Sequence, residues 1–289
     1  MRILLTGADG FTGRHLERHA EARGHDILPL RADLTDPEAV QREVLEGAPD
    51  AAVHLAAISF VGHEDATAFY AVNVLGTVHL LEALSTLPIR PRGILLASSA
   101  NIYGNCAASP IAETQPPAPV NHYAASKLAM EHMALTYRER LPLVFTRPFN
   151  YTGPGQAPSF VIPKLVAHFA RRADHIELGN LHVEREFNDV RMVCDVYLSL
   201  LEQGEPGEIY NVCTGRPYTL QQVLDELSDL TGHVPRIEVN PAFVRANEVH
   251  RLCGNPAKLQ ALARERGFAI PEFTLRETWE SMLNAAGPA

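Results

Sequence analysis

Lysine is scarce in this sequence. Only three of its 25 basic residues are lysine, Lys127, Lys164 and Lys258, and the rest are arginine. Because a compact ammonium and a planar guanidinium serve different purposes in a site, each lysine needs its own explanation, and we expect Lys258 at the surface. The 34 acidic residues outnumber the basic ones and give a net charge of −9. An acidic chain has no general electrostatic attraction to nucleic acids or anionic membranes, so we expect neither as a partner.

Cysteines are few, and no apolar segment has membrane-spanning length. The four cysteines are Cys106, Cys194, Cys213 and Cys253, and no two have the spacing of a zinc-ribbon ligand pair. We therefore expect free thiols in a reducing compartment and no metal. The N-terminus lacks the apolar region of a signal peptide, and no run of about 18 apolar residues is present. These absences predict a soluble, cytoplasmic protein.

The sequence does contain an ordinary globular composition. Of its 289 residues, 46% are hydrophobic and 20% are charged, which argues against a disordered or disulfide-stapled chain. A chain of this length can bury a core in one large or two modest domains without disulfides.

Short apolar runs alternate with helical patterns through the first 150 residues. The apolar runs are continuous, which is typical of strands that are buried on both faces. This rhythm predicts an α/β fold, a Rossmann-type doubly wound parallel sheet with right-handed crossovers. The expected strands are 2–6, 26–30, 51–55, 93–98, 143–147 and 208–212, and the expected helices between them are 11–23, 37–46, 68–84 and 123–140. Further helices over 161–172, 220–230 and 275–283 predict a smaller α/β region beside the sheet.

A glycine-rich turn follows the first expected strand. Gly7, Gly10 and Gly13 have the spacing Gly-x-x-Gly-x-x-Gly, and Phe11 and Thr12 open the helix that follows. Such a turn lets the backbone approach a pyrophosphate, and the helix N-terminus offers free N–H groups. A tight turn without a ligand is the alternative, but the position between strand and helix favours dinucleotide binding.

The end of the second strand bears on the choice of cofactor. An acid there would bind the ribose 2′-hydroxyl of NAD, but the sequence reads Leu30-Arg31-Ala32. Arg31 lies where a 2′-phosphate would bind, so NADP(H) is preferred and NAD(H) remains open. A merely solvated Arg31 is the alternative. Asp33 is better placed for the adenine than for the ribose.

A tyrosine and a lysine lie four residues apart in Tyr123-Ala124-Ala125-Ser126-Lys127, on one face of a helix. A free tyrosine has a pKa of about 10, and we expect the neighbouring ammonium to lower it. The pair can then act as general acid or base on a carbinol or ketone. Coincidence is the alternative, but the composition gives only about 0.08 such pairs by chance, whereas acid–base chemistry requires one.

A hydroxyl partner is expected at the end of the fourth strand. Ser99 lies in the segment Ser98-Ser99-Ala100-Asn101. Ligands of open α/β sheets bind beyond the carboxyl ends of the strands. Ser99 could therefore hydrogen-bond a substrate carbonyl oxygen as its charge changes, although a serine-rich turn is the alternative.

Together these motifs resemble the extended short-chain dehydrogenase/reductase superfamily over nearly the whole chain. The segments His54–Ala57, Asn73–Thr77 and Arg147–Asn150 also match. The resemblance implies that Ser99, Tyr123 and Lys127 are catalytic, that Asn73 supports their helix and that Pro148 borders the nicotinamide. The cofactor contacts that it implies are Gly7, Gly10, Phe11, Thr12, Gly13, Arg31, Asp33, Leu34, Leu55, Ala56, Ala57, Asn73, Tyr123, Lys127 and Pro148.

The C-terminal half resembles the GDP-mannose dehydratases and their partner reductases. The matching segments include Gly153–Gln156, Gly179–Leu181 and Arg185–Phe187. Arg245 and Glu248 fall in an Arg-x-x-Glu-Val pattern, where arginine would meet the diphosphate and glutamate the nucleoside. Surface salt bridges are the alternative for each residue singly. The substrate contacts implied are Asn101, Asn150, Phe160, Val161, Lys164, Arg185, Arg245 and Glu248.

Asn101 separates the reactions of this group. At the position of Asn101, two residues before Tyr103, dehydratases have a glutamate that acts as the base for the sugar C5 proton. The fucose-forming epimerase-reductase has a cysteine at this position. The amide of Asn101 cannot serve as that base, so dehydration and C3/C5 epimerisation are disfavoured. Hydride transfer to a C4 ketone needs only Ser99, Tyr123, Lys127 and the cofactor.

The resemblance therefore implies reduction of GDP-4-dehydro-6-deoxy-D-mannose to GDP-D-rhamnose. A nucleotide-sugar 4-epimerase with tightly bound NAD is the alternative, and a non-catalytic nucleotide-binding protein is a third. The expected dinucleotide-binding domain is 1–152 plus about 182–213, and the expected nucleotide-sugar domain is about 153–181 plus 214–289. The family implies a homodimer through helices 68–84 and 123–140.

Overall fold

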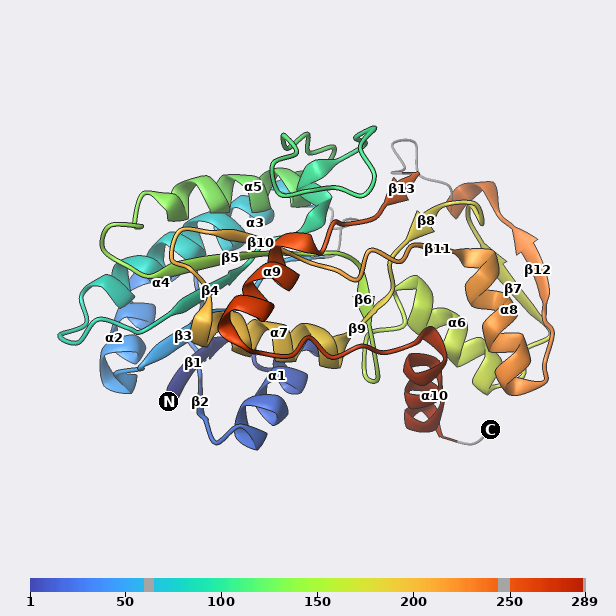
Figure 1. Ribbon diagram of the computed structural model, residues 1–289, viewed down its shortest axis with the longest axis horizontal. Coiled ribbons are helices and arrows are strands. Elements are labelled where there is room, and N and C mark those ends of the chain that lie inside the picture. Colours follow the sequence, from blue (N-terminus) through green and yellow to red (C-terminus); the bar gives the residue numbers. More distant parts are fainter. Residues whose placement is uncertain (60–64, 244–249, 288–289) are drawn as a thin grey trace.

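Six parallel strands form the central sheet (Figure 1). The computed structural model describes residues 1–59, 65–243 and 250–287. From one edge to the other the strands are β10 (Ile209–Val212), β5 (Leu143–Pro148), β4 (Ile94–Ala97), β3 (Ala51–His54), β1 (Arg2–Thr6) and β2 (Asp26–Pro29). Every pairing is parallel. All six strands coincide with predicted ones to within two residues, so the predicted α/β fold class is confirmed.

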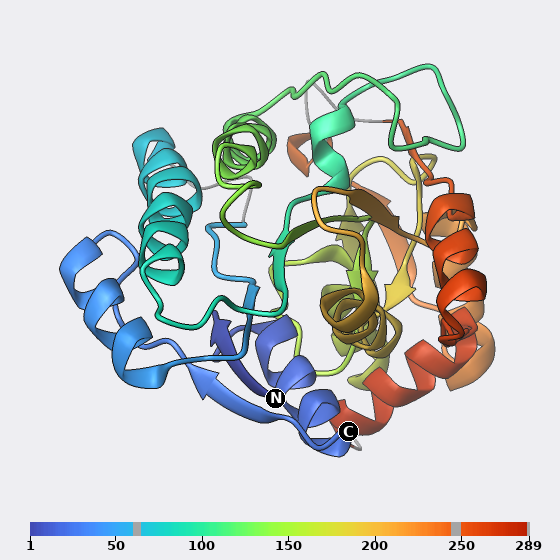
Figure 2. The ribbon, with the colours of Figure 1, turned by 60° about the vertical axis from the view of Figure 1, so that its left-hand side comes forward.

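Helices cover both faces of this sheet (Figures 1 and 2). Successive residues of a strand point to opposite faces, so Ile3 and Leu5 of β1 join one core cluster and Leu4 joins another. The cluster of Ile3 and Leu5 packs against α1 (Phe11–Ala22), α7 (Val190–Gln203) and α9 (Ala257–Arg266). The cluster of Leu4 packs against α2 (Pro37–Gly47), α4 (Gly76–Ser85) and α5 (His122–Leu135). The sequence pattern predicts neither α7 nor α9.

The expected helix 68–84 is continuous but contains an irregular turn. It consists of α3 (Ala66–Tyr70), a π-helical turn η1 (Ala71–Leu75) and α4. The 20 residues Ala66–Ser85 have a mean hydropathy of 1.3, which by length and composition alone would suit a membrane span. Half of the helix is buried inside the fold, and Leu80, Leu81 and Leu84 lie in the sheet core. It is therefore a core helix.

A smaller mixed region lies beside the sheet and has its own core (Figure 1). Its helices are α6 (Val161–Ala170), α8 (Leu220–Thr231) and α10 (Leu275–Ala286), and its strands include β7 (His175–Leu178) and β12 (Arg236–Val239). Short elements complete the chain: β6 (Tyr151–Thr152), β8 (Glu184–Arg185), β9 (Asn188–Asp189), β11 (Tyr218–Thr219), β13 (Arg251–Leu252) and the 3₁₀ turns η2 (Ala100–Tyr103) and η3 (Pro241–Phe243). Leu165, Phe169, Val223 and Trp279 are buried together at its centre.

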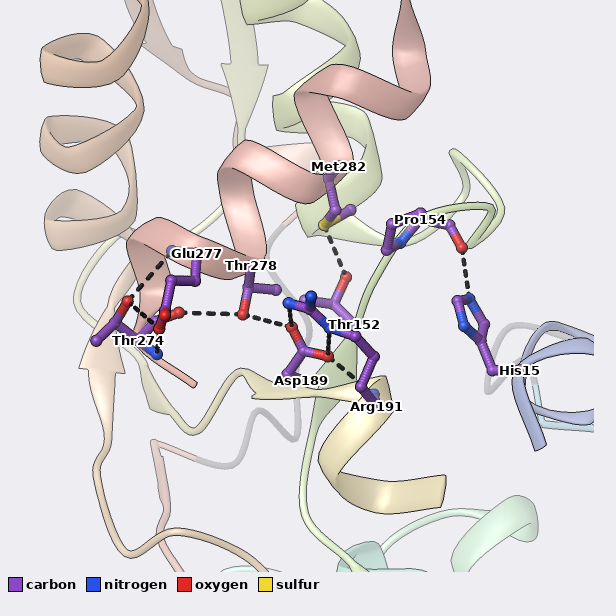
Figure 3. Close-up of polar contacts among 9 residues, drawn as sticks. All are labelled: His15, Thr152, Pro154, Asp189, Arg191, Thr274, Glu277, Thr278 and Met282. Atoms are coloured by element: carbon purple, nitrogen blue, oxygen red, sulfur yellow. Dashed lines mark hydrogen bonds and ion pairs between the residues drawn. The ribbon is translucent and has the colours of Figure 1, made fainter. Parts of the chain in front are cut away.

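A polar cluster fastens this region to the sheet (Figure 3). Asp189 caps α7 by accepting from the backbone N–H of Arg191 at 2.8 Å and also binds the Arg191 guanidinium. Thr278 of α10 donates to the same carboxylate at 2.8 Å. Nearby, His15 of α1 bonds the carbonyl of Pro154 at 2.8 Å. The last helix of the chain is thus tied to the start of a helix that packs on the sheet.

Candidate active site

The expected cofactor turn lies where the strand order reverses. β1 pairs with β2 on one side and with β3 on the other, and ligands of open α/β sheets bind at such a switch point. Gly7 follows β1 with φ +72°, and Ala56 follows β3. A Cβ added at Gly7 would lie 2.9 Å from the Ala56 nitrogen, so only glycine fits between the two loops. The structure thus brings the predicted turn and the 55–57 segment together.

The N-terminus of α1 is built to receive an anion. Its cap residue, Gly10, offers no side-chain hydrogen bond, and within the described chain the first turn of this helix holds no acidic residue. A Cβ at Gly13 would come 2.2 Å from the Gly7 carbonyl oxygen, so the turn packs directly on the helix. Free N–H groups and the helix dipole suit a pyrophosphate here. The residues present therefore fit a dinucleotide.

Phe11 and Thr12 contact a residue that follows β5. The ring of Phe11 stacks on that of Tyr151 with centroids 6.1 Å apart. The hydroxyls of Thr12 and Tyr151 are 2.8 Å apart and hydrogen-bonded. These two predicted cofactor residues thus also hold the segment that leads from the sheet into the smaller region.

A buried hydrogen-bond chain runs beneath the cofactor turn. The Thr6 hydroxyl accepts from the N–H groups of Leu55 and Ala56, both at 3.1 Å, so its own proton goes to His54 Nδ1 at 2.7 Å. His54 Nε2 then donates to Thr77 Oγ1 at 2.9 Å. Burial, with a smaller effect of Lys127, lowers the pKa of His54 to about 3. The neutral imidazole therefore fixes the loop after β3.

Asn73 links that loop to the helix of the tyrosine and lysine. Its Oδ1 accepts from the Ile58 N–H at 2.9 Å, and its Nδ2 donates to the Ile58 carbonyl at 3.1 Å and to Ser126 Oγ at 3.0 Å. Asn73 is buried in the π-helical turn, a feature often found at functional sites. Its position suits the predicted support of α5.

Ser99 and Tyr123 form the centre of the candidate site. Ser99 caps η2, and its Oγ accepts from the N–H and from Nδ2 of Asn101, both at 3.2 Å. Its hydrogen bond with Tyr123 lowers the pKa of the phenol, but burial has the larger effect and raises that pKa. The net direction is upward, so the expectation of a lowered pKa is not met.

The position of Lys127 explains why its ammonium does not lower the pKa of Tyr123. Its Nζ donates to the carbonyl of Ala97, the last residue of β4, at 2.6 Å. It is not among the groups that shift the pKa of Tyr123. Lys127 is 3% exposed, and burial lowers its pKa to about 8, against the opposing charge of Glu131. The ammonium is held at the end of β4, two residues before Ser99.

Arg31 lies beside the glycine turn but is already paired. Its Nη1 is 2.6 Å from Asp9 Oδ2, in an exposed ion pair. The N–H groups of Arg31 and Ala32 both donate to the Glu43 carboxylate at 2.7 Å. A 2′-phosphate at this edge would therefore meet two carboxylates as well as the expected arginine. Neither Asp9 nor Glu43 is singled out by the sequence pattern.

Asp33 and Leu34 have local structural roles. Asp33 accepts from the N–H and hydroxyl of Thr35, both at 2.8 Å, and these bonds lower its pKa. Leu34 is buried, and a Cβ added at Gly76 would lie 2.8 Å from the Leu34 Cβ. Leu34 therefore packs against the start of α4. Pro148 ends β5, at the same edge of the sheet as Ala97.

The predicted substrate residues fall into two groups. Asn101 and Asn150 lie just beyond β4 and β5, and the Asn150 carbonyl accepts from the Asn188 N–H at 2.9 Å. Phe160 and Val161 are each 38% exposed at the start of α6.

The cationic residues of the second group lie in the smaller region. Lys164 donates to the Glu177 carbonyl at 2.8 Å and lies 4.8 Å from the Phe243 ring centre. Arg185 donates to the Glu184 carbonyl at 2.9 Å. The predicted residues Arg245 and Glu248 lie outside the described residues.

Comparison with known proteins identifies the family. The model for "GDP-mannose 4,6 dehydratase" matches residues 12–269. The chain belongs to this family of extended short-chain dehydrogenase/reductases. This member is 36% identical to GDP-6-deoxy-D-talose 4-dehydrogenase of Aggregatibacter actinomycetemcomitans over 98% of both chains. It is 35% identical to GDP-6-deoxy-D-mannose reductase of Pseudomonas aeruginosa over 98% of this chain and 96% of that one.

Solved structures resemble this family member over its whole length. The Pseudomonas aeruginosa protein RMD, complexed with NADPH, superimposes with a TM-score of 0.90 at 34% identity, covering 99% of this chain and 98% of that one. A protein described as an epimerase from Burkholderia cenocepacia gives 0.91 at 45% identity, covering 99% and 97%. Thermus thermophilus UDP-glucose 4-epimerase with NAD gives 0.85 at 29%, covering 99% of each chain. The chain is thus an NAD(P)-binding short-chain dehydrogenase/reductase that modifies nucleotide sugars.

Proposed function

We propose that this enzyme uses NAD(P)H to reduce the C4 ketone of GDP-4-dehydro-6-deoxy-D-mannose, forming GDP-D-rhamnose. The observation that carries the proposal is the bonded group of Tyr123, Ser99 and Asn101. It provides a proton donor and a carbonyl-binding hydroxyl, and it has an amide where a dehydratase has its base. The 35–36% identity to a GDP-6-deoxy-D-mannose reductase and a GDP-6-deoxy-D-talose dehydrogenase supports the same reaction class.

Tyr123 would supply the proton. Burial raises its pKa, so the phenol keeps its proton near neutral pH and can donate it to the ketone oxygen. Ser99 would hydrogen-bond that oxygen as negative charge develops on it. Lys127 would hold the nicotinamide ribose. The bound nicotinamide supplies the hydride to the sugar C4.

The cofactor would bind across Gly7, Gly10, Gly13 and Ala56, with NADPH preferred and NADH accepted. Arg31 supports the preference, because a guanidinium matches a 2′-phosphate. To reach that phosphate, Arg31 would leave its ion pair with Asp9. The exposed pair costs little to break, since surface ion pairs contribute about 0–1 kcal/mol. We therefore expect a moderate preference for NADPH over NADH.

The nucleotide sugar would bind between the sheet edge and the smaller region. We propose that residues 1–152 plus about 182–213 bind the cofactor, and that about 153–181 plus 214–289 bind the GDP-sugar. The separate core of the smaller region supports it. The proposed contacts are Asn101, Asn150, Phe160, Val161, Lys164, Arg185, Arg245 and Glu248.

A 4-epimerase with retained NAD is the second candidate. The Burkholderia cenocepacia protein described as an epimerase, at 45% identity, favours it. The same Tyr123 would then remove and return a proton at the C4 hydroxyl. The two candidates differ in net redox change: a reductase consumes one nicotinamide per product, and an epimerase consumes none. A non-catalytic nucleotide-binding protein has no use for this acid–base group.

We further propose a cytoplasmic homodimer. Leu75 of η1 and Met133 of α5 are 54% and 43% exposed, and the helices that carry them pack against each other. Apolar side chains exposed on adjacent helices suit a self-complementary interface. Light scattering on the purified protein would give twice the chain mass.

The decisive experiment mixes GDP-4-dehydro-6-deoxy-D-mannose with NADPH or NADH. The expected result is loss of reduced-nicotinamide absorbance and formation of a GDP-6-deoxyhexose. Its C4 configuration, read by NMR, separates GDP-D-rhamnose from GDP-6-deoxy-D-talose. Absence of nicotinamide consumption would remove the reductase proposal. Interconversion of GDP-hexoses without added reductant would establish the epimerase instead.

A further inference from the structure

A buried ion pair lies next to the candidate active site. Arg147 of β5 and Glu131 of α5 have side chains that are 5% and 2% exposed. The guanidinium binds the carboxylate through two contacts, Nε to Oε1 at 3.0 Å and Nη2 to Oε2 at 2.7 Å. Taking two charges out of water is costly and needs such bidentate geometry together with further hydrogen bonds.

Those further bonds come from the segment that begins at Ser99. Arg147 Nη1 donates to the Tyr103 hydroxyl at 3.0 Å and to the Glu113 carbonyl at 3.3 Å. Its guanidinium also lies 5.0 Å from the Tyr103 ring centre. The Tyr103 hydroxyl in turn donates to Asn211 Oδ1 at 2.8 Å. The Arg147 guanidinium is therefore contacted by polar or aromatic groups on several sides.

The ion pair thereby joins the two elements that carry the acid–base group. Ser99 caps the four-residue turn η2, and Tyr103 is the last residue of that turn. Lys127 and Glu131 are four residues apart on α5, so they lie on one face of the helix. Arg147 binds Tyr103 on one side and Glu131 on the other. A shift of either element would stretch these bonds.

Glu131 also affects the charge of Lys127. Its carboxylate raises the pKa of the lysine, while burial lowers it to about 8. Lys127 in turn affects the pKa of His54 on β3, and Arg147 on β5 is bound to Glu131. His54 is neutral above a pH of about 3. Glu131 is thus the negative charge that acts on this ammonium.

We propose that Arg147 and Glu131 are positioning residues that hold Ser99 and Lys127 in register and keep Lys127 protonated at working pH. This inference rests on the proposed acid–base function. Stability alone does not require the pair, because buried ion pairs can often be replaced by apolar residues without loss. A positioning role is distinguished from a purely stabilising one by a double variant of Arg147 and Glu131 that still folds but in which the pKa of Lys127 is changed.

The first test uses the scarcity of lysine. With three lysines in the chain, ¹³C-labelled lysine gives three NMR signals, and Lys127→Met assigns one of them. We expect the Lys127 signal to titrate near pH 8 in the wild type and at lower pH in Glu131→Gln. The double variant Arg147→Met/Glu131→Leu should show the same downward shift. A matched control is Glu208→Gln, which removes the carboxylate 2.6 Å from Lys258 and should leave the Lys127 titration unchanged.

The second test is the pH profile of kcat/KM. If protonated Lys127 is required, a lower pKa moves the alkaline loss of activity to lower pH in both variants. We also expect kcat to fall by at least about 10-fold, since small displacements of catalytic groups have effects of this size. Glu131→Asp keeps the charge but shortens the side chain, which draws the carboxylate away from Arg147, so it should leave the Lys127 titration near its wild-type position while lowering kcat.

Three outcomes would overturn the inference. One is a folded double variant whose Lys127 titration and pH profile match the wild type. Another, if the double variant does not fold, is Glu131→Gln with an unchanged Lys127 titration. The third is Glu131→Asp with wild-type kcat, which would remove the positioning role. A wild type without reductase activity would instead contradict the proposed function, and the NMR titration would still test the pair.

Discussion

The Nδ2 of Asn101 lies 3.2 Å from Ser99 Oγ and donates a hydrogen bond to it. The backbone N–H of Asn101 donates to the same oxygen. Because two donors approach Ser99 Oγ, the serine proton is directed outward, where it can meet a substrate carbonyl or the Tyr123 phenol. Asn101 thus orients the hydroxyl that we propose binds the substrate carbonyl.

Removing the Asn101 side chain should impair reduction without abolishing it. Asn101→Ala loses one of the two bonds to Ser99, and we expect kcat/KM to fall by about 10-fold, near the lower range for losing a group that supports transition-state charge. Steady-state kinetics against the keto sugar would measure the change. An unchanged kcat/KM would show that Asn101 does not orient Ser99.

Removing the Tyr123 hydroxyl should have a larger effect. Tyr123→Phe lacks the proton donor, so turnover should fall by about 10²–10⁴-fold, the usual contribution of general acid catalysis. Cofactor affinity, read by nicotinamide fluorescence, should persist because the glycine turn is untouched. Near-wild-type turnover in this variant would rule out the proposed acid.

Asp9 should limit the preference for NADPH. Asp9→Asn frees Arg31 from its ion pair, so the KM for NADPH should fall by about 2- to 5-fold, the range that corresponds to an exposed pair. The KM for NADH should stay constant. The opposite change, a higher KM for NADPH, is expected for Arg31→Ala. Equal changes for both cofactors in Asp9→Asn would contradict a role at the 2′-phosphate.

The buried charge of Lys127 should lower the free energy of unfolding. Its pKa is about 8 in the fold and about 10.5 when exposed, so the fold disfavours the charged form. The cost is absent above a pH of about 10.5 and complete below about 8. Lys127→Met should therefore raise the free energy of unfolding at pH 7 by on the order of 1–3 kcal/mol, and by less at pH 10.

Urea unfolding at the two pH values measures that effect. Lys258→Met is the matched control, because the Lys258 ammonium is partly exposed and bound to Glu208 and to the Ile209 carbonyl, both at 2.6 Å. We expect no stabilisation in the control. A Lys127→Met protein that is less stable than the wild type at pH 7 would contradict the cost of the buried charge.

The strands were predictable because strands buried on both faces give short, continuous apolar runs. Helix α7 was not, although it belongs to the same core. Ten of its 14 residues are buried, and a long apolar run does not by itself separate a buried helix from a buried strand. Helix α9 presents the opposite difficulty, because its buried residues are only Leu259, Leu262 and Ala263.

The site shows a similar division. The Tyr123–Lys127 pair is visible in the sequence because both residues lie on one helix. The chain Thr6–His54–Thr77 is not, since its members come from β1, β3 and α4 and meet only after folding. The direction of the Tyr123 pKa shift also depended on the fold, which places the Lys127 Nζ against Ala97.

The contacts of the three lysines also depend on the folded structure. Each of the three donates to a backbone carbonyl, those of Ala97, Glu177 and Ile209. The Lys258 side chain is 36% exposed, and its ammonium also fastens α9 to β10. The sequence indicated tasks for Lys127 and Lys164 but none of these three contacts, because each carbonyl lies far from its lysine along the chain.

The most direct test of the account is the stoichiometry of the reaction with GDP-4-dehydro-6-deoxy-D-mannose. Nicotinamide consumption and GDP-6-deoxyhexose formation would be measured in the same mixture, with Tyr123→Phe as the inactive reference. The proposed reductase oxidises one reduced nicotinamide for each keto sugar converted. Conversion of the sugar without net oxidation of NAD(P)H, or no conversion at all, would contradict it.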